Sequence, residues 1–336
     1  ETFISDKRPF FTENQGLFAF TTPSDNSQLL YTRRVGGPAD DGEGSGDIVA
    51  ALKLNGSFGA TKYGVFAADE ADEVGRTFSA LRLVRDFASQ NLGLMLTNTE
   101  RPWLDREATV LGVDHDWRPS ERWNVRTRLI GSDVEQAGRT TRDTGATVWA
   151  DYEMDGGWRQ QWIGMLFGND LQLNDAGYLS RNSLRYAHWH VSRRFSDLPA
   201  ESRYASKEWR GRVTTVYNDH GQQLNHQLRI IRSSSLRNGG SEFAQININA
   251  AGFDDLLMRG HGVVHLPPDF YAVLEYQRPR KGNWGYDINL DVFSGGMSGN
   301  HRVGYGLEIE PTYFVSDAFS MYVGAEINRT PDWLVW

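Results

Sequence analysis

The 336-residue chain contains no cysteine and no long apolar run, and each absence narrows what the protein can be. A chain without thiols suits passage through an oxidising periplasm, although a reducing cytoplasm or chance would also explain the absence of cysteine. The lack of any stretch of about 18 apolar residues excludes a transmembrane helix. The same absence does not exclude a closed β-barrel, because a barrel also satisfies every backbone polar group within a membrane. The net charge of −8 argues against a nucleic-acid partner.

What the sequence does contain is a repeated run of about ten residues in which apolar and polar side chains alternate. Residues 122–132, 244–250 and 284–292 are the clearest examples. Because successive side chains on a strand point to opposite faces, such runs predict strands that are apolar on one face and strongly polar on the other. The hydrophobic fraction of 39% is low for a large protein with a dry core. The pattern favours an all-β, up-and-down antiparallel transmembrane barrel over a β-propeller or β-solenoid, since neither a blade motif nor a short repeat is found.

The alternation predicts about seventeen strands, and the connections between them vary regularly in length. The strands centre near residues 32, 51, 65, 82, 95, 112, 127, 149, 163, 188, 213, 229, 246, 274, 288, 306 and 323. Short links such as 118–121 and 154–157 alternate with long ones such as 134–145 and 168–182, as expected for periplasmic turns and outer loops. Bacterial barrels generally use an even number of strands, so we expect 18 or more, with residues 332–336 approaching the next one.

The first forty residues carry a recognisable signature, Lys7-Arg8-Pro9-Phe10-Phe11-Thr12-Glu13-Asn14, then Leu17-Phe18, then Leu30-Tyr31-Thr32-Arg33-Arg34-Val35-Gly36. Together with 100–103 (Glu-Arg-Pro-Trp), this resembles an uncharacterised family of bacterial outer-membrane proteins. In that family a periplasmic domain similar to family-9 carbohydrate-binding modules precedes a large barrel of unknown function. The resemblance implies the barrel fold and an outer-membrane location, and no activity. We expect the module, and the last strands of the barrel, to lie outside this chain.

We therefore divide the chain into an entry or plug segment, residues 1–27, and a barrel, residues 28–336. The cluster of Phe10, Phe11, Leu17 and Phe18 is too short to span a membrane. It is suited to capping a barrel end or lying at the interface, and an ordinary hydrophobic contact explains it equally well.

Sites for chemistry are few. Nucleophile-elbow, zinc-protease, phosphate-loop and dinucleotide motifs are all absent, so nothing indicates an enzyme and we expect no cofactor. His188 and His190 share a strand face and are weak candidates for a metal site, more simply read as solvated lumen histidines. The stretch 40–47 (Asp-Asp-Gly-Glu-Gly-Ser-Gly-Asp) could chelate Ca²⁺, but it lacks EF-hand spacing and is better read as a mobile acidic surface loop.

Charges on the face opposite the apolar side chains form the more informative pattern. If apolar residues face lipid, the lumen-lining basic residues are Arg82, Arg126, Arg128, Arg210, Arg212 and Arg229. The lumen-lining acidic residues are Asp114, Asp116, Asp151, Asp287, Asp291, Glu308, Glu310 and Glu326. A barrel with these residues would have a basic wall and a partly opposed acidic wall, which would orient dipolar solutes. The alternative is that the charges merely pair with cross-strand neighbours.

Two hypotheses of function follow. The first is a pore in the outer membrane of a Gram-negative bacterium, for small polar solutes such as saccharides, because about 17 strands leave room for an aqueous channel. The second is a non-enzymatic scaffold or membrane anchor with a plugged lumen, serving a periplasmic carbohydrate-binding module or another envelope protein. Either protein would have the lipid bilayer and lipopolysaccharide as its surroundings, and no nucleic acid.

Overall fold

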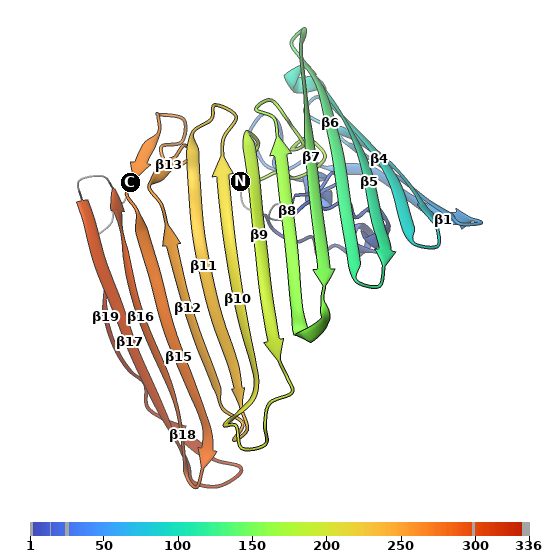
Figure 1. Cartoon of the computed structure of the whole chain (residues 1–336). Coiled ribbons are helices and arrows are strands. Elements are labelled where there is room, and N and C mark those ends of the chain that lie inside the picture. The colour runs from blue at the N-terminus through green and yellow to red at the C-terminus, as the bar shows by residue number, and fades with distance from the viewer. Residues whose placement is uncertain (1–2, 14, 24–26, 298–299, 331–336) are drawn as a thin grey trace. The chain divides into compact units, whose positions relative to one another are not determined.

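The computed structural model describes residues 3–13, 15–23, 27–297 and 300–330, and these are mostly β-structure (Figure 1). The short helices are α1 (Pro9–Thr12) and the 3₁₀ helices η1 (Gln15–Phe18), η2 (Thr32–Arg34), η3 (Pro102–Leu104) and η4 (Asp155–Gly157). The strands are β1 (Ile48–Phe58), β2 (Thr61–Glu70), β3 (Thr77–Asp86), β4 (Gln90–Arg101), β5 (Arg106–Ser120), β6 (Trp123–Gln136), β7 (Arg139–Glu153), β8 (Trp158–Phe167), β9 (Leu184–Phe195), β10 (Tyr204–Tyr217), β11 (Gln223–Leu236), β12 (Ser241–Asn249), β13 (Gly252–Asp254), β14 (Val264–Leu266), β15 (Asp269–Lys281), β16 (Trp284–Met297), β17 (Asn300–Phe314), β18 (Ser320–Tyr322) and β19 (Ala325–Arg329).

The predicted fold class is confirmed. Each long strand pairs antiparallel with the strand that follows it, from β1 to β6 and again from β10 through β12 and β15 to β17. Seventeen strands belong to one large sheet, and β13 pairs with β14 in a separate hairpin within the connection between β12 and β15. No helix among the described residues has the length and apolar character needed to cross a membrane.

The strand predicted near residue 32 is wrong. Residues Thr32–Arg34 form η2, closed by a hydrogen bond from the Val35 N–H to the Thr32 carbonyl, and Gly36 follows with a φ of 70°. The segment before the first strand therefore extends to Asp47. The strand predicted near 323 is broken into β18 and β19, both of which pair with β17. If these two count as one, the long strands in the described residues number sixteen, so the odd count that suggested a further strand disappears; residues 332–336 lie outside the described part.

The long loop predicted at 134–145 is also wrong, whereas the one predicted at 168–182 is confirmed by the strand-free stretch between β8 and β9. Strand β6 continues to Gln136 and β7 begins at Arg139. The turn between them is Ala137-Gly138, with φ values of 49° and 73°, as the two central residues of a tight hairpin turn require. Residues 139–144 are polar on both faces of the strand, so this stretch of sequence resembles a loop.

The chain forms two compact units, of which the first comprises Glu1–Asp151 and Ile163–Tyr186. In this unit the N-terminal segment, residues 3–47, packs against one face of β2–β5, named here the covered face. Phe18, Phe20, Leu29 and Val35 of the segment are buried, as are strand residues such as Phe66, Phe78, Met95 and Val110. Gly64 and Gly112 make this approach close, because a Cβ there would come within 2.7 Å of the Phe18 ring and 2.5 Å of the Leu29 side chain. Each fully buried large side chain contributes about 1.5–3 kcal/mol.

The opposite face of β2–β6 is apolar and exposed. Directly paired residues form two apolar rows across the sheet: Val65, Leu81, Leu96 and Leu111 in one, and Tyr63, Leu83, Leu94, Val113 and Leu129 in the other. Leu94 is 36% exposed and Leu129 is 53% exposed. A polar row of Ser79, Asn98, Thr109 and Asp133 borders them at one edge.

The second unit comprises Tyr152–Trp162 and Ala187–Trp336. Its strands β10–β12 and β15–β17 lie side by side (yellow to red in Figure 1). Leu228, Ile248, Leu274 and Leu290 are exposed and lie on one face of this sheet, while Arg229, Asn247, Glu275 and Asp291 lie on the other. We name these the apolar face and the polar face of the second unit.

Candidate functional site

The candidate site is the polar face of the second unit, where the strand register aligns side chains in rows across the sheet. One row runs through Arg212, Arg229, Asn247, Tyr271 and Phe293, and the next through Arg210, Ile231, Gln245, Val273 and Asp291. Two further rows lie toward the short turn at 282–283: Glu208, Ser233, Phe243, Glu275, Asn289, Glu308 and Glu326, then Ser206, Ser235, Ser241, Gln277, Asp287 and Glu310. Within these four rows the arginines lie on β10 and β11, and most of the acids lie on β15–β19.

The basic part of this face is held by amides. Arg212 Nη2 donates a hydrogen bond to Gln227 Oε1 at 3.3 Å, and Arg229 Nε donates to Asn247 Oδ1 at 2.8 Å. Gln227 in turn donates to Asn249 at 3.0 Å, and Asn249 donates to Asp269. These amide partners orient the guanidinium groups of Arg212 and Arg229.

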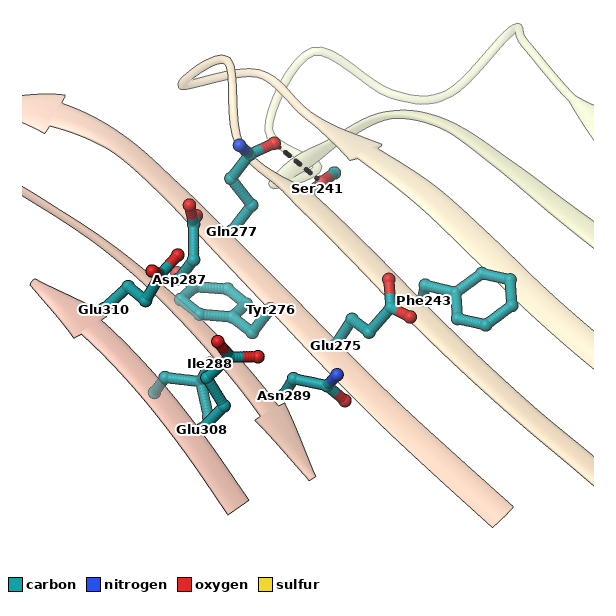
Figure 2. A pocket seen from close by; sticks show the side chains of 10 residues that line it. All are labelled: Ser241, Phe243, Glu275, Tyr276, Gln277, Asp287, Ile288, Asn289, Glu308 and Glu310. Atoms are coloured by element: carbon teal, nitrogen blue, oxygen red, sulfur yellow. Dashed lines mark hydrogen bonds between the residues drawn. The ribbon is translucent and has the colours of Figure 1, made fainter. Parts of the chain in front are cut away.

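The acidic part is concentrated in a hollow of about 390 Å³ lined by Glu275, Asp287, Glu308 and Glu310 (Figure 2). Asp287 lies directly opposite Glu310, and Glu308 directly opposite Glu326. Like charges in directly opposed positions are destabilising. In the part of the chain that the structure describes, none of the four hollow carboxylates forms an ion pair. The described residues also hold no group of three His, Asp or Glu side chains arranged to bind a metal ion.

The two candidate metal-binding histidines lie on β9. His188 Nε2 is 3.2 Å from Gln161 Oε1 of β8. His190 is two residues further along the same strand.

In the first unit the predicted lumen charges are brought together as ion pairs. Arg82 and Asp114 form a bidentate pair and are only 4% and 3% exposed, and Arg82 Nε also donates to the Leu17 carbonyl at 3.2 Å. They therefore lie under the N-terminal segment and face no open lumen. Asp116 accepts from Arg128 at 2.7 Å.

Arg126 is paired as well. It contacts Asp151 at 2.9 Å and stacks over the Trp149 ring at 3.7 Å. The six predicted lumen charges of the first unit therefore form three ion pairs with one another.

A chain of buried ion pairs fastens the N-terminal segment and the 168–183 loop to the strand ends. Asp40 accepts from Arg101 at 2.7 Å, and Asp175 accepts from Arg101 and Arg106 at 2.9 and 2.7 Å. Asp40, predicted to belong to a mobile surface loop, has a side chain only 1% exposed, so that expectation is wrong for this residue. Burial alone would raise the pKa of Asp175, but the hydrogen bonds from Arg106 and Arg101 hold it below its ordinary value.

Aromatic side chains gather where the short turns lie. In the first unit Phe58, Phe87 and Trp117 are exposed beside the turns that follow β1, β3 and β5. In the second unit Trp158, Trp284 and Phe319 are exposed beside the turns before β8, β16 and β18. Belts of this kind are typical of membrane–water interfaces.

Sequence reasoning missed Glu275 and Gln227, and it did not include the amides Gln245, Asn247 and Asn249 among the candidate site residues. The run 269–281 is apolar at several positions of both faces, with Tyr271 and Val273 preceding Glu275 on the polar face, so its parity was hard to assign. The alternation 244–250 placed the three strand-β12 amides on the polar face, but only the register shows that they separate the arginines from the acids.

No family model matches the chain, and no curated protein matches it. A solved structure, that of OccK10 (OpdN) from Pseudomonas aeruginosa, resembles it with 13% sequence identity and a TM-score of 0.45, over 83% of this chain and 86% of that one. By its strand order and its two-faced strands, the chain has the up-and-down antiparallel fold of transmembrane β-barrels.

Proposed function

We propose that the protein is an outer-membrane β-barrel of a Gram-negative bacterium and forms a pore for small polar solutes such as saccharides. The observation that carries the membrane location is the exposed apolar face of both units. In the first unit it includes Leu81, Leu83, Leu94, Leu96 and Leu111, paired side by side on three strands. Soluble monomers rarely expose a contiguous apolar surface of this extent.

The apolar band also has the height that a membrane requires. On β4 it lies between the polar residues Gln90 and Asn98, which are eight residues apart, or about 27 Å along the strand. With a barrel-like strand tilt of 35–45°, this corresponds to about 21 Å along the membrane normal. The outward apolar band of outer-membrane barrels is about 25 Å tall.

The pore proposal is supported by the polar face of the second unit. The four carboxylates of its hollow form no ion pair among the described residues, and burying such charges away from water would be costly. The scaffold or anchor alternative is favoured by a different observation, the N-terminal segment packed on β2–β5 of the first unit, which would narrow any lumen. The amide and carboxylate groups suit solutes rich in hydroxyl groups, including saccharides.

The experiment is to reconstitute the protein in planar bilayers and in liposomes. Stepwise conductance, and liposome swelling that falls as the saccharide grows from glucose to maltotriose, would support the pore. A variant without residues 3–47 is the matched control, because it should conduct more if the segment only narrows the path. Silence of the intact protein in both assays would refute the pore, and the alternative would then be tested by capture of a periplasmic module.

A further inference from the structure

A groove of about 420 Å³ crosses the apolar face of the second unit, over the neighbouring strands β10–β12, β15 and β16 (Figure 1). Trp209 and Ile230 line it on the β10–β11 side and Leu274 on the β15 side. Ala244 and Ala272 have the smallest side chains of its lining and form its floor. If this face meets lipid, the groove can seat part of an acyl chain by van der Waals packing.

Positive charge lies at one end of this groove. Arg232 lines the groove itself, directly opposite Ala244. Lys207 lies on the same face, in the next row toward the turn at 237–240, and Arg203 immediately precedes β10. Basic side chains on a lipid-facing surface are costly, and ionisable residues within a membrane commonly mark a functional site.

These three basic residues, named here the basic cluster, are accompanied by a single acid. Glu242 forms ion pairs with both Arg203 and Arg232, the second at 3.2 Å. Lys207 forms no ion pair in the part of the chain that the structure describes, and its Nζ lies 3.8 Å from the centre of the Tyr204 ring. Three cations and one carboxylate leave the cluster with an excess of positive charge, which is complementary to an anion.

A buried hydroxyl group without a partner lies beside the same cluster. Ser234 is directly opposite Lys207 on one side and Glu242 on the other, and it is only 5% exposed. Its Oγ has no hydrogen-bond partner among the described residues. Arg232 donates through Nη2 to Tyr204 Oη at 2.8 Å and to Glu242, which leaves its remaining N–H groups for a ligand. A phosphate group could accept from the hydroxyl, the ammonium and the guanidinium together.

The neighbouring turn holds this end of the sheet in place. The Arg237 side chain donates to the carbonyl of Ser202 at 2.9 Å and to those of Leu198 and Pro199 at 3.1 Å. The Arg237 N–H also donates to the Arg203 carbonyl at 2.9 Å. Because the short turns of outer-membrane barrels are periplasmic, the basic cluster would lie at the periplasmic border of the apolar band.

We propose that the groove and the basic cluster bind one anionic phospholipid of the periplasmic leaflet. Its phosphate lies at Lys207, Arg232 and Ser234. One acyl chain lies over Ala244 and Ala272. The charge of the cluster selects the anionic headgroup and the groove holds the chain, so neither half of the lipid makes all the contacts. This inference rests on the membrane location in the proposed function and is independent of whether the lumen conducts.

The test is native mass spectrometry of the folded protein in a non-ionic detergent, titrated with phosphatidylglycerol. Diacylglycerol with the same chains is the control without a phosphate, and glycerol phosphate is the control without chains. Phosphatidylglycerol should remain bound at one copy per protein, whereas both controls should bind much more weakly. Lipid A, which also carries phosphate, should compete poorly; tighter binding of lipid A would overturn the assignment to a phospholipid.

Three variants locate the site, each checked for folding by its mobility on unheated gels. Lys207→Gln should raise the phosphatidylglycerol dissociation constant by about fivefold, as expected for one basic residue at an anionic lipid surface. Ser234→Ala should raise it by about two- to tenfold through the loss of one hydrogen bond. Ala244→Leu keeps every charge but fills the groove, and it should also weaken binding. Lys281→Gln is the matched control, because this exposed lysine lies on β15 beside another short turn and does not line the groove.

Equal affinity for phosphatidylglycerol and diacylglycerol would overturn the site. Equal losses in Lys207→Gln and Lys281→Gln would do the same, because they would show a general attraction of basic residues to anionic lipid. A protein that conducts but shows no lipid preference would refute only the site. One that binds the lipid specifically but never conducts would uphold the site and refute only the pore.

Discussion

Leu94→Arg is the substitution that most sharply tests whether the apolar face meets lipid. Leu94 is in the middle of β4, directly opposite Leu83 of β3 and Val113 of β5, and its side chain is 36% exposed. If this face met water, an exposed Leu→Arg change would alter the free energy of unfolding by no more than about 0.5 kcal/mol. If it faces the bilayer midplane, the same change should cost about 2–4 kcal/mol. The two environments therefore predict folding equilibria that differ by about ten- to several-hundredfold.

The measurement is urea-dependent folding into lipid vesicles, followed by the mobility shift of the folded barrel on unheated gels. Ser79→Arg is the matched control, because Ser79 is on the same face in the polar row that borders the band. It should cost about 0–1 kcal/mol, as expected near an interface. Equal, small effects at the two positions would refute the membrane orientation, and with it the proposed pore.

Three further predictions concern charged groups. Asp114→Asn leaves Arg82 buried without its partner and should destabilise the protein by about 3–5 kcal/mol in the same urea assay, whereas Arg142→Gln should change the free energy of unfolding by no more than about 0.5 kcal/mol. Replacing Asp287 and Glu310 by Asn and Gln should lower the preference of the pore for cations, most visibly well below 0.1 M salt, where the screening length exceeds about 10 Å; an unchanged reversal potential would place the hollow off the conduction path. Burial alone would raise the pKa of Asp6, but hydrogen bonds from Arg8 and Thr32 lower it from 3.8 to about 2. Its contribution to holding the N-terminal segment is therefore complete above pH 3.8 and lost as the pH falls through about 2, so protease cleavage within residues 3–47 should be as slow at pH 4 as at pH 7 and should accelerate only near pH 2.

The period-two alternation predicted most of the strands because it depends on each residue separately, through the environment of the face on which its side chain lies. It failed at residues 30–35, where Leu30, Thr32 and Arg34 alternate with Tyr31, Arg33 and Val35 as a strand would. There the local hydrogen bonds of η2 and the left-handed Gly36 compete successfully with strand formation. It also failed at Arg139–Thr144, where β7 extends beyond the apolar rows and needs no apolar side.

The partners of the charged residues were harder to predict, since they depend on register. Arg128 and Arg212 look alike in the sequence, each alternating with apolar neighbours. The register places Asp116 within 2.7 Å of Arg128, but it sets Arg229 opposite Arg212. Arg128 is therefore part of an ion pair and Arg212 is held by the amide of Gln227, and no property of either strand alone distinguishes them.

The packing of the N-terminal segment on the first unit could nevertheless have been predicted from the sequence. Strands β2 and β3 carry Phe66, Ala68, Phe78 and Ala80 on the covered face, whereas a water-filled lumen would require polar residues there. On β12 and β16 the corresponding positions hold Gln245, Asn247, Asp287 and Asp291. A two-sided apolar strand in a chain of otherwise one-sided strands therefore indicates that a segment packs on its second face. By this reasoning, Phe66→Gln should weaken the packing of residues 3–47 and expose them to protease, while Asn247→Gln on the uncovered face should not.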